Sequence, residues 1–121
     1  MNTETQQQKR QLGQSNHIHC RNYAEDHGNP SGGYAHGPGM CISWQDGPRG
    51  RDHGGNLFPA NGAFVEDALV AAHQRLAFFQ ESQYAHSANA EAMDYIERAI
   101  DCLKRRADQR SQRGVLGQNV V

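Results

Sequence analysis

Glycine and proline are distributed very unevenly along this chain of 121 residues. Ten of the 13 glycines and all four prolines lie between Gly28 and Gly62, whereas residues 63–113 contain neither. Because both residue types interrupt helices, the long stretch without them is where helices can form. The pattern predicts an α+β fold: a small N-terminal antiparallel β part, followed by a C-terminal antiparallel helical hairpin.

Apolar residues recur at helical spacing within the second half of the chain. The spacing predicts helices over about residues 63–81 and 88–112, each with an apolar seam in steps of three and four. The seams are Val65, Leu69, Ala72, Leu76 and Phe79, and then Met93, Ile96, Ile100, Leu103 and Ala107. Asn61 and Ser87 are the predicted N-caps, since their side chains can accept hydrogen bonds from free helical N–H groups.

The pattern of the first half of the chain predicts fewer helices and strands. Residues 36–60 are expected to be β-rich: Met40 to Gln45 alternates like a strand, and Asn56 to Pro59 is a candidate partner for it. Residues 1–16 are rich in Gln and are predicted to be disordered. The remaining residues, 17–121, are predicted to form one small domain.

The apolar content is low for a chain that must fold alone. Leu, Ile, Val and Phe make up 19 of 121 residues, below the roughly 20% typical of globular chains, yet the net charge is only −1. Further apolar residues lie off the seam of the first helix: Phe64, Ala68, Val70, Ala71 and Phe78. We expect this second stripe to be an interface, so the sequence predicts a homo-oligomer built on helix contacts.

Several classes of protein are excluded by composition. The sequence contains no run of about 18 apolar residues, which a membrane span would need. Its N-terminal residues also lack the apolar core of a secretory signal. The three cysteines, Cys20, Cys41 and Cys102, are widely separated, so we expect no disulfide framework and a reducing cytosol. The near-zero net charge excludes a protein that coats nucleic acid by bulk charge.

The strongest chemical pattern is basic. Six of the 12 Lys and Arg residues fall within residues 98–113: Arg98, Lys104, Arg105, Arg106, Arg110 and Arg113. Arg106, Arg110 and Arg113 share one helical face, and the guanidinium fork suits phosphate. The alternative is a solvated helix end whose cations complement the helix dipole. Arg49 and Arg51 lie in a Gly-rich turn that either contacts phosphate or is only a turn.

An aromatic pattern lies at the other end of the predicted hairpin. Phe78 and Phe79 end the first helix, and Tyr84 and Asn89 surround the turn. An aromatic ring can stack on a nucleobase and an amide can read its edge, although Phe79 could simply fill the hairpin and Asn89 start a helix. Asn89 and Arg106 are separated by about 25 Å along a helix. They can form one site only in a two-fold dimer with antiparallel chains.

No catalytic or metal-binding pattern is evident. Histidines and a cysteine cluster loosely (His17, His19, Cys20, His27, His36 and His53), but their spacing matches no zinc site. The chain lacks nucleophile-elbow, metalloprotease and Walker patterns. We therefore expect no metal, no cofactor and no enzymatic activity.

Three stretches of the chain resemble the first-described Thoeris anti-defence family of bacteriophages. They are Gly39 to Pro48, Asn61 to Asp67 and Arg113 to Gly117. The resemblance covers roughly residues 36–121. It implies a sponge in the host bacterial cytoplasm that sequesters glycocyclic ADP-ribose isomers without degrading them, and so blocks Thoeris effector activation. It also implies dimers that assemble into hexamers, in which some members hold cyclic di- or trinucleotides of CBASS at a second site.

The resemblance assigns ligand-binding roles to particular residues. Phe79 or its neighbour Phe78 would stack on the ligand, and Asn89 would complete the pocket together with the arginines of the second helix. These arginines are Arg106, Arg110 and Arg113. Arg51, with Arg49 beside it, would serve the second nucleotide site.

Other functions remain open on the residues alone. The Arg face fits a small nucleic-acid-binding helical protein, although neither DNA nor a membrane is an expected partner. The exposed apolar face fits a phage inhibitor that binds a host protein directly. His17, His19 or His53 could serve a nucleotide-degrading enzyme.

Overall fold

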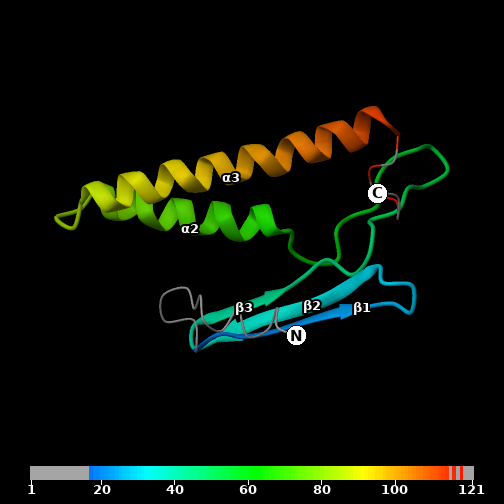
Figure 1. Cartoon of the computed structure of the whole chain (residues 1–121), viewed down its shortest axis with the longest axis horizontal. Helices are drawn as coiled ribbons and strands as arrows, with labels where there is room; N and C mark the ends of the chain where they lie inside the picture. Colours follow the sequence, from blue (N-terminus) through cyan, green and yellow to red (C-terminus); the bar gives the residue numbers. More distant parts are fainter. Residues whose placement is uncertain (1–16, 115, 117, 119–121) are drawn as a thin grey trace.

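The computed structural model describes residues 17–114, 116 and 118. Its elements are β1 (His19–Ala24), β2 (Pro30–Gly37), β3 (Met40–Ser43), α2 (Val65–Gln80) and α3 (Ser87–Gln112). The strands form one antiparallel sheet in the order β1-β2-β3, and the two helices run antiparallel in a separate layer (Figure 1). The predicted α+β class is confirmed. The predicted disorder of residues 1–16 lies outside the described residues.

The sheet is a meander with one tight turn. Gly37 pairs with Met40, so only Pro38 and Gly39 connect β2 to β3. Proline fixes the first central position of the turn, and Gly39 has a φ of 77° at the second, which L side chains rarely adopt. β1 and β2 are joined by a longer loop, and their register shifts between Asn22 and Ala24.

The strand predicted at Met40 to Gln45 is present as β3, whereas β1 and most of β2 precede the expected β-rich segment of residues 36–60. The partner of β3 is β2, not Asn56 to Pro59; Leu57 instead forms an isolated bridge with Arg51. The glycines of β2 hide its alternation from sequence analysis, yet they are needed for close strand approach. A Cβ atom at Gly33 would collide with the carbonyl oxygen of Arg21.

Both predicted helix caps are wrong. The N-cap of α2 is Phe64, whose N–H donates to the Asp67 carboxylate at 2.7 Å. The Asn61 side chain is used elsewhere, because its Oδ1 accepts from the backbone N–H of Asp46 at 2.8 Å. For α3 the N-cap is His86, whose Nδ1 accepts from the Ala88 N–H at 2.9 Å, and Ser87 is already helical. Both caps thus depend on hydrogen bonds that the spacing of residue types in the sequence does not reveal.

The two helices pack through the seam of α3. All five seam residues of α3 are half-buried, whereas on α2 Val65 and Ala72 are exposed. A polar contact crosses the hairpin, where His73 Nε2 lies 2.7 Å from Glu97 Oε2. Neither described helix combines the length and apolar character needed to cross a membrane.

The described part of the chain has almost no buried core. Ala35, at 5% exposure, is the one described residue that is buried. Large apolar side chains remain open: Tyr23, Met40, Phe58, Phe64, Val65, Val70, Phe78, Tyr84 and Tyr95. The accessible surface is 9387 Å², against about 6,500 Å² for a compact monomer of this mass. The exposed second stripe of α2 is thus present, with Ala68 as a half-buried exception.

We expect Gly62→Ala to destabilise the fold by about 1–3 kcal/mol, the range for forced overpacking. The added Cβ would lie 2.6 Å from the backbone carbon and oxygen of Trp44, where residue 63 bridges to it. Urea unfolding followed by circular dichroism measures the change. Gly54→Ala is the matched control, because its Cβ would contact only side-chain atoms at 3.4 Å and beyond. Equal stability of the two variants would contradict the close approach at Gly62.

Candidate ligand-binding site

The predicted stacking residues lie at the C-terminal end of α2. Phe78 is 57% exposed, Phe79 is half-buried, and their ring centroids are 6.1 Å apart. The guanidinium of Arg75 lies over both rings, 5.2 Å from the Phe78 centroid and 4.9 Å from that of Phe79. The site therefore has a cation beside its rings. Sequence analysis missed Arg75, although its spacing of three and four residues from the rings is a helical neighbour signal.

Asn89 follows these rings in the chain and lies in the first turn of α3. Its side-chain amide already holds together the turn between α2 and α3. Its Nδ2 donates to Gln80 Oε1 at 3.0 Å and to the Tyr84 carbonyl at 3.2 Å. Gln80 Oε1 also accepts from the His86 N–H at 2.8 Å. Asn89 thus has the helix-start role considered as the alternative, and Oδ1 is the atom left to serve a ligand. Gln80 was not anticipated from the sequence.

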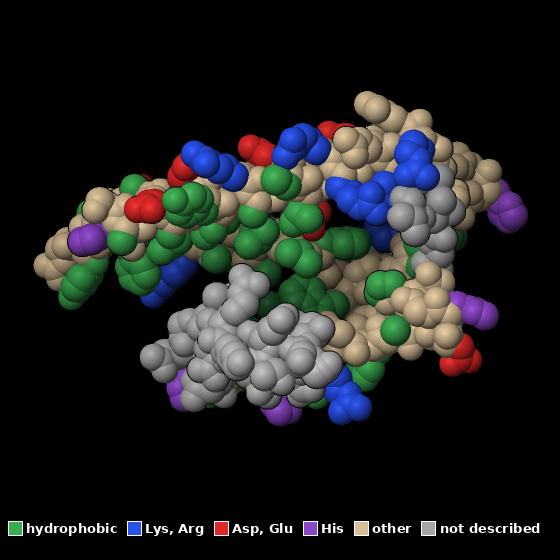
Figure 2. Space-filling model, viewed as in Figure 1, with side chains coloured by type: hydrophobic (Ala, Val, Ile, Leu, Met, Phe, Trp, Pro, Cys, Tyr) green, Lys and Arg blue, Asp and Glu red, His purple; other side chains and the backbone are tan. Residues whose placement is uncertain are grey.

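The predicted phosphate-binding arginines lie toward the C-terminal end of α3. Arg106 and Arg113 are exposed, while Arg110 is half-buried and its Nη2 donates to the Gln118 carbonyl at 2.8 Å. Figure 2 shows Lys and Arg side chains gathered over this end of the helix. The surface here offers fixed guanidinium donors for an anion.

Arg51 reaches the same place from the connection between sheet and hairpin. Its Nε donates to the Leu116 carbonyl at 3.2 Å and its Nη1 to the Gly55 carbonyl at 2.6 Å. Arg51 and Arg110 therefore both bind the short segment that follows α3, and this segment lies beside the loop of residues 50–58 (Figure 1). The residues predicted for two separate sites are neighbours in the fold.

The loop that carries Arg51 is held by its own hydrogen bonds. Asp52 Oδ1 accepts from the N–H groups of Gly54 and Asn56, both at 2.9 Å. Arg49 Nε donates to the Phe58 carbonyl at 2.6 Å. Of the two alternatives for Arg49, a phosphate contact or a residue of a turn, the second fits, because its guanidinium fastens the two sides of the loop.

The aromatic end and the arginine end do not meet within one chain. Asn89 and Arg106 both belong to the continuous helix α3, which spans 26 residues. At the helical rise, their 17-residue separation is about 25 Å. Figure 1 shows the hairpin turn and the end of α3 at opposite ends of the molecule. Within one chain, the two groups of predicted site residues are therefore separate.

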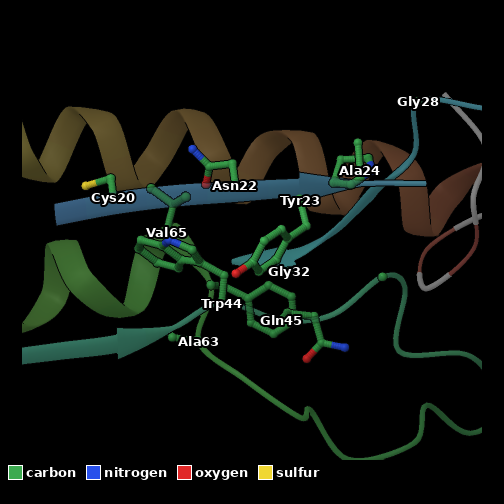
Figure 3. A pocket seen from close by; sticks show the side chains of 13 residues that line it. Cys20, Asn22, Tyr23, Ala24, Gly28, Gly32, Trp44, Gln45, Ala63 and Val65 are labelled. Atoms are coloured by element: carbon green, nitrogen blue, oxygen red, sulfur yellow. The ribbon is translucent and has the colours of Figure 1, made fainter. Parts of the chain in front are cut away.

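A concavity in the described part lies elsewhere and contains none of the predicted ligand-binding residues. It measures about 680 Å³ and lies between β1 and the segment that enters α2. Figure 3 shows the side chains of Tyr23, Trp44 and Val65 gathered beside β1. Its lining is mainly apolar and includes no Lys or Arg side chain that could bind a phosphate.

Histidine and cysteine do not assemble a metal centre here. Among residues 17–114, 116 and 118, no three His, Cys, Asp or Glu side chains are placed to hold one ion. Cys20, Cys41 and Cys102 are free and exposed. The chemistry that the hairpin ends offer is ring stacking and guanidinium hydrogen bonding.

We expect Gln80→Ala to weaken the hairpin turn by about 1 kcal/mol, because it removes the acceptor for two hydrogen bonds. Hydrogen exchange of the amides of residues 81–86 measures this loss. Gln83→Ala, an exposed change in the same turn, is the matched control and should leave exchange unchanged. Slow exchange in both variants would show that Gln80 does not organise the turn.

The chain was compared with known proteins. No protein-family model matches it. Over 76 residues, or 63% of the chain, it is 37% identical to a protein of Bacillus phage SBSphiJ7 that is named Thoeris anti-defense 1. The aligned part is 49% of that protein, so the chain spans about half the length of this relative.

Proposed function

We propose that the chain is a phage anti-defence protein acting in the host cell. The ground is the similarity above, which supports membership of the Thoeris anti-defence family. It binds cyclic nucleotide immune signals, foremost glycocyclic ADP-ribose isomers, and sequesters them without degrading them. Thoeris effectors then lack their activating signal. The observation that carries the mechanism is the division of the candidate site between the two ends of α3.

The two half-sites can be joined by a second copy of the chain. A two-fold axis across antiparallel α3 helices would place Phe79 and Asn89 of one copy near Arg106 of the other, and it would do so twice. The surface available for such packing is apolar: Val70 is 41% exposed, Phe78 57% and Tyr95 58%. Because the described part of one chain has almost no closed core, burial of these side chains in the dimer would also add stability.

The residues of the joined site match the ligand chemically. Guanidinium groups form charge-assisted hydrogen bonds with phosphates, and stacking on an aromatic ring contributes about 1–3 kcal/mol per base. Arg75 places a further cation at the ring end. Rings and guanidinium donors bind a dianion but provide no proton acceptor for hydrolysis, so the ligand would be released intact.

The same proposal extends to cyclic di- and trinucleotides. Arg51 lies near Arg110 through the segment after α3, so a larger cyclic phosphate ligand could engage this end when several dimers assemble. Such binding would block CBASS effectors in the same way.

We expect tight calorimetric binding of glycocyclic ADP-ribose to the full chain, with the intact ligand recovered by chromatography after heat denaturation. Phe79→Ala should weaken binding by roughly tenfold or more, in line with the loss of one stacking contact. Arg106→Ala should have a similar or larger effect, while size-exclusion chromatography shows an unchanged assembly. Lys104→Ala, a charge change on the opposite side of α3, is the control for non-specific electrostatics.

Different results would redirect the assignment. Normal binding by both variants would exclude the joined site. A degraded ligand would indicate an enzyme. The absence of binding to either ligand class, combined with capture of one host defence protein, would favour direct inhibition through the exposed apolar face.

We expect two inactive variants to complement each other. A mixed dimer of a Phe79→Ala chain and an Arg106→Ala chain would contain one site with both residues intact, hence about half of the wild-type sites. Co-expression with two different affinity tags and tandem purification isolates this dimer, and titration counts its sites. If each site lies within a single chain, the mixed dimer will bind no more ligand than either variant alone.

A further inference from the structure

A row of aromatic and basic side chains lies on one face of the sheet, away from the hairpin ends. Because strand residues alternate between faces, His19 and Arg21 of β1 share one face. Tyr23 lies at the register shift of β1 and joins them through its contacts with Arg21 and Tyr34. The register places His36 opposite His19 and Tyr34 opposite Arg21, so both β2 side chains join the same face. We call these five residues the sheet ring cluster.

The rings of the cluster contact one another in sequence along the two strands. The Tyr34 and His36 rings are stacked, with centroids 4.6 Å apart and planes 13° apart. His19 lies 6.3 Å from His36, and Tyr23 meets Tyr34 edge-on at 6.5 Å. The guanidinium of Arg21 lies 5.8 Å from the Tyr23 ring centroid. The face thus presents a continuous group of rings with a cation beside it.

The cluster is open to solvent and faces no acidic strand residue. His19, Arg21 and His36 are exposed, and Tyr23 is 46% exposed. No residue of β1, β2 or β3 is Asp or Glu. The opposite face carries buried Ala35, and Figure 2 shows histidines at the margin of the sheet layer that is turned away from the helices. Of the five residues, Tyr23 also lines the concavity between β1 and the segment that enters α2, whereas the other four do not.

We propose that the sheet ring cluster binds single-stranded nucleic acid. From His19 to Tyr23 the strand extends about 13 Å, which accommodates two or three bases. Every base has a π face that can stack on Tyr or His, and Arg21 is placed to meet the backbone phosphate. The ligand is a single strand because a duplex hides its base faces. Stacking needs little net charge on the protein. This mode of binding therefore differs from the coating of nucleic acid by bulk charge, which the sequence argued against, and it departs from the expectation that DNA is not a partner.

This site is independent of the proposed sequestration function. None of its residues belongs to the hairpin turn or to the arginine end of α3, and the two sites can therefore be lost separately.

The test uses the full chain and fluorescein-labelled ten-nucleotide single strands, one of uridine and one of deoxythymidine, in fluorescence anisotropy at low salt. We expect saturable binding of both that weakens as salt is raised. Tyr23→Ala should weaken it roughly tenfold, since it removes one stacking ring. Tyr23→Phe should retain wild-type binding because the ring remains. Circular dichroism confirms that each variant is folded.

The chain offers a closely matched control pair on α3. Arg98 lies 5.8 Å from the ring centroid of Tyr95, the same distance as in the Arg21 and Tyr23 pair, and Tyr95 is 58% exposed. Arg21→Gln should weaken binding about fivefold or more, whereas Arg98→Gln and Tyr95→Ala should not change it. The proposal is overturned by an absence of saturable binding, by an equal loss in the control pair, or by loss of binding in Arg106→Ala alone.

Discussion

The limited burial of apolar surface within one chain governs the rest of this structure. A three-stranded sheet and a two-helix hairpin each have one face to cover, and in the described part only Ala35 is buried. Half-buried seams hold the hairpin together, while Val70 and Phe78 stay open. Because burial of apolar area is the main favourable term in folding, the second copy of the chain that we propose would supply the missing contacts.

The length of α3 links this need for a partner to ligand binding. A continuous helix of 26 residues keeps the rings and Asn89 at one end and Arg106 toward the other. A shorter helix would let one chain build a complete pocket. With this length, the dimer packing that we propose would cover the apolar surface and also bring the unlike half-sites together. Assembly and affinity therefore depend on one interface in the proposed mechanism, and an assembly variant would lose both.

The arginines of this protein divide between structure and surface. Arg49, Arg51 and Arg110 donate to backbone carbonyls and thereby fasten the loop of residues 50–58 and the segment after α3. Arg21 and Arg75 instead lie over aromatic rings. A guanidinium that already bonds a carbonyl binds phosphate with its remaining N–H groups, whereas one placed beside a ring can support stacking and phosphate contact together.

The sequence by itself determined the helices and the general fold class. Residues 63–113 lack glycine and proline and repeat apolar residues every three or four positions, and local hydrogen bonding suffices to form a helix from such a pattern. It also named Phe79, Asn89 and Arg106 as residues of interest. Only the tertiary structure decided the partner of β3, the caps, the hydrogen bond between Asn89 and Gln80, and the hydrogen bonds of Arg51 and Arg110 to the segment after α3. These contacts join residues far apart in the chain or without a repeating pattern, so their spacing carries no signal.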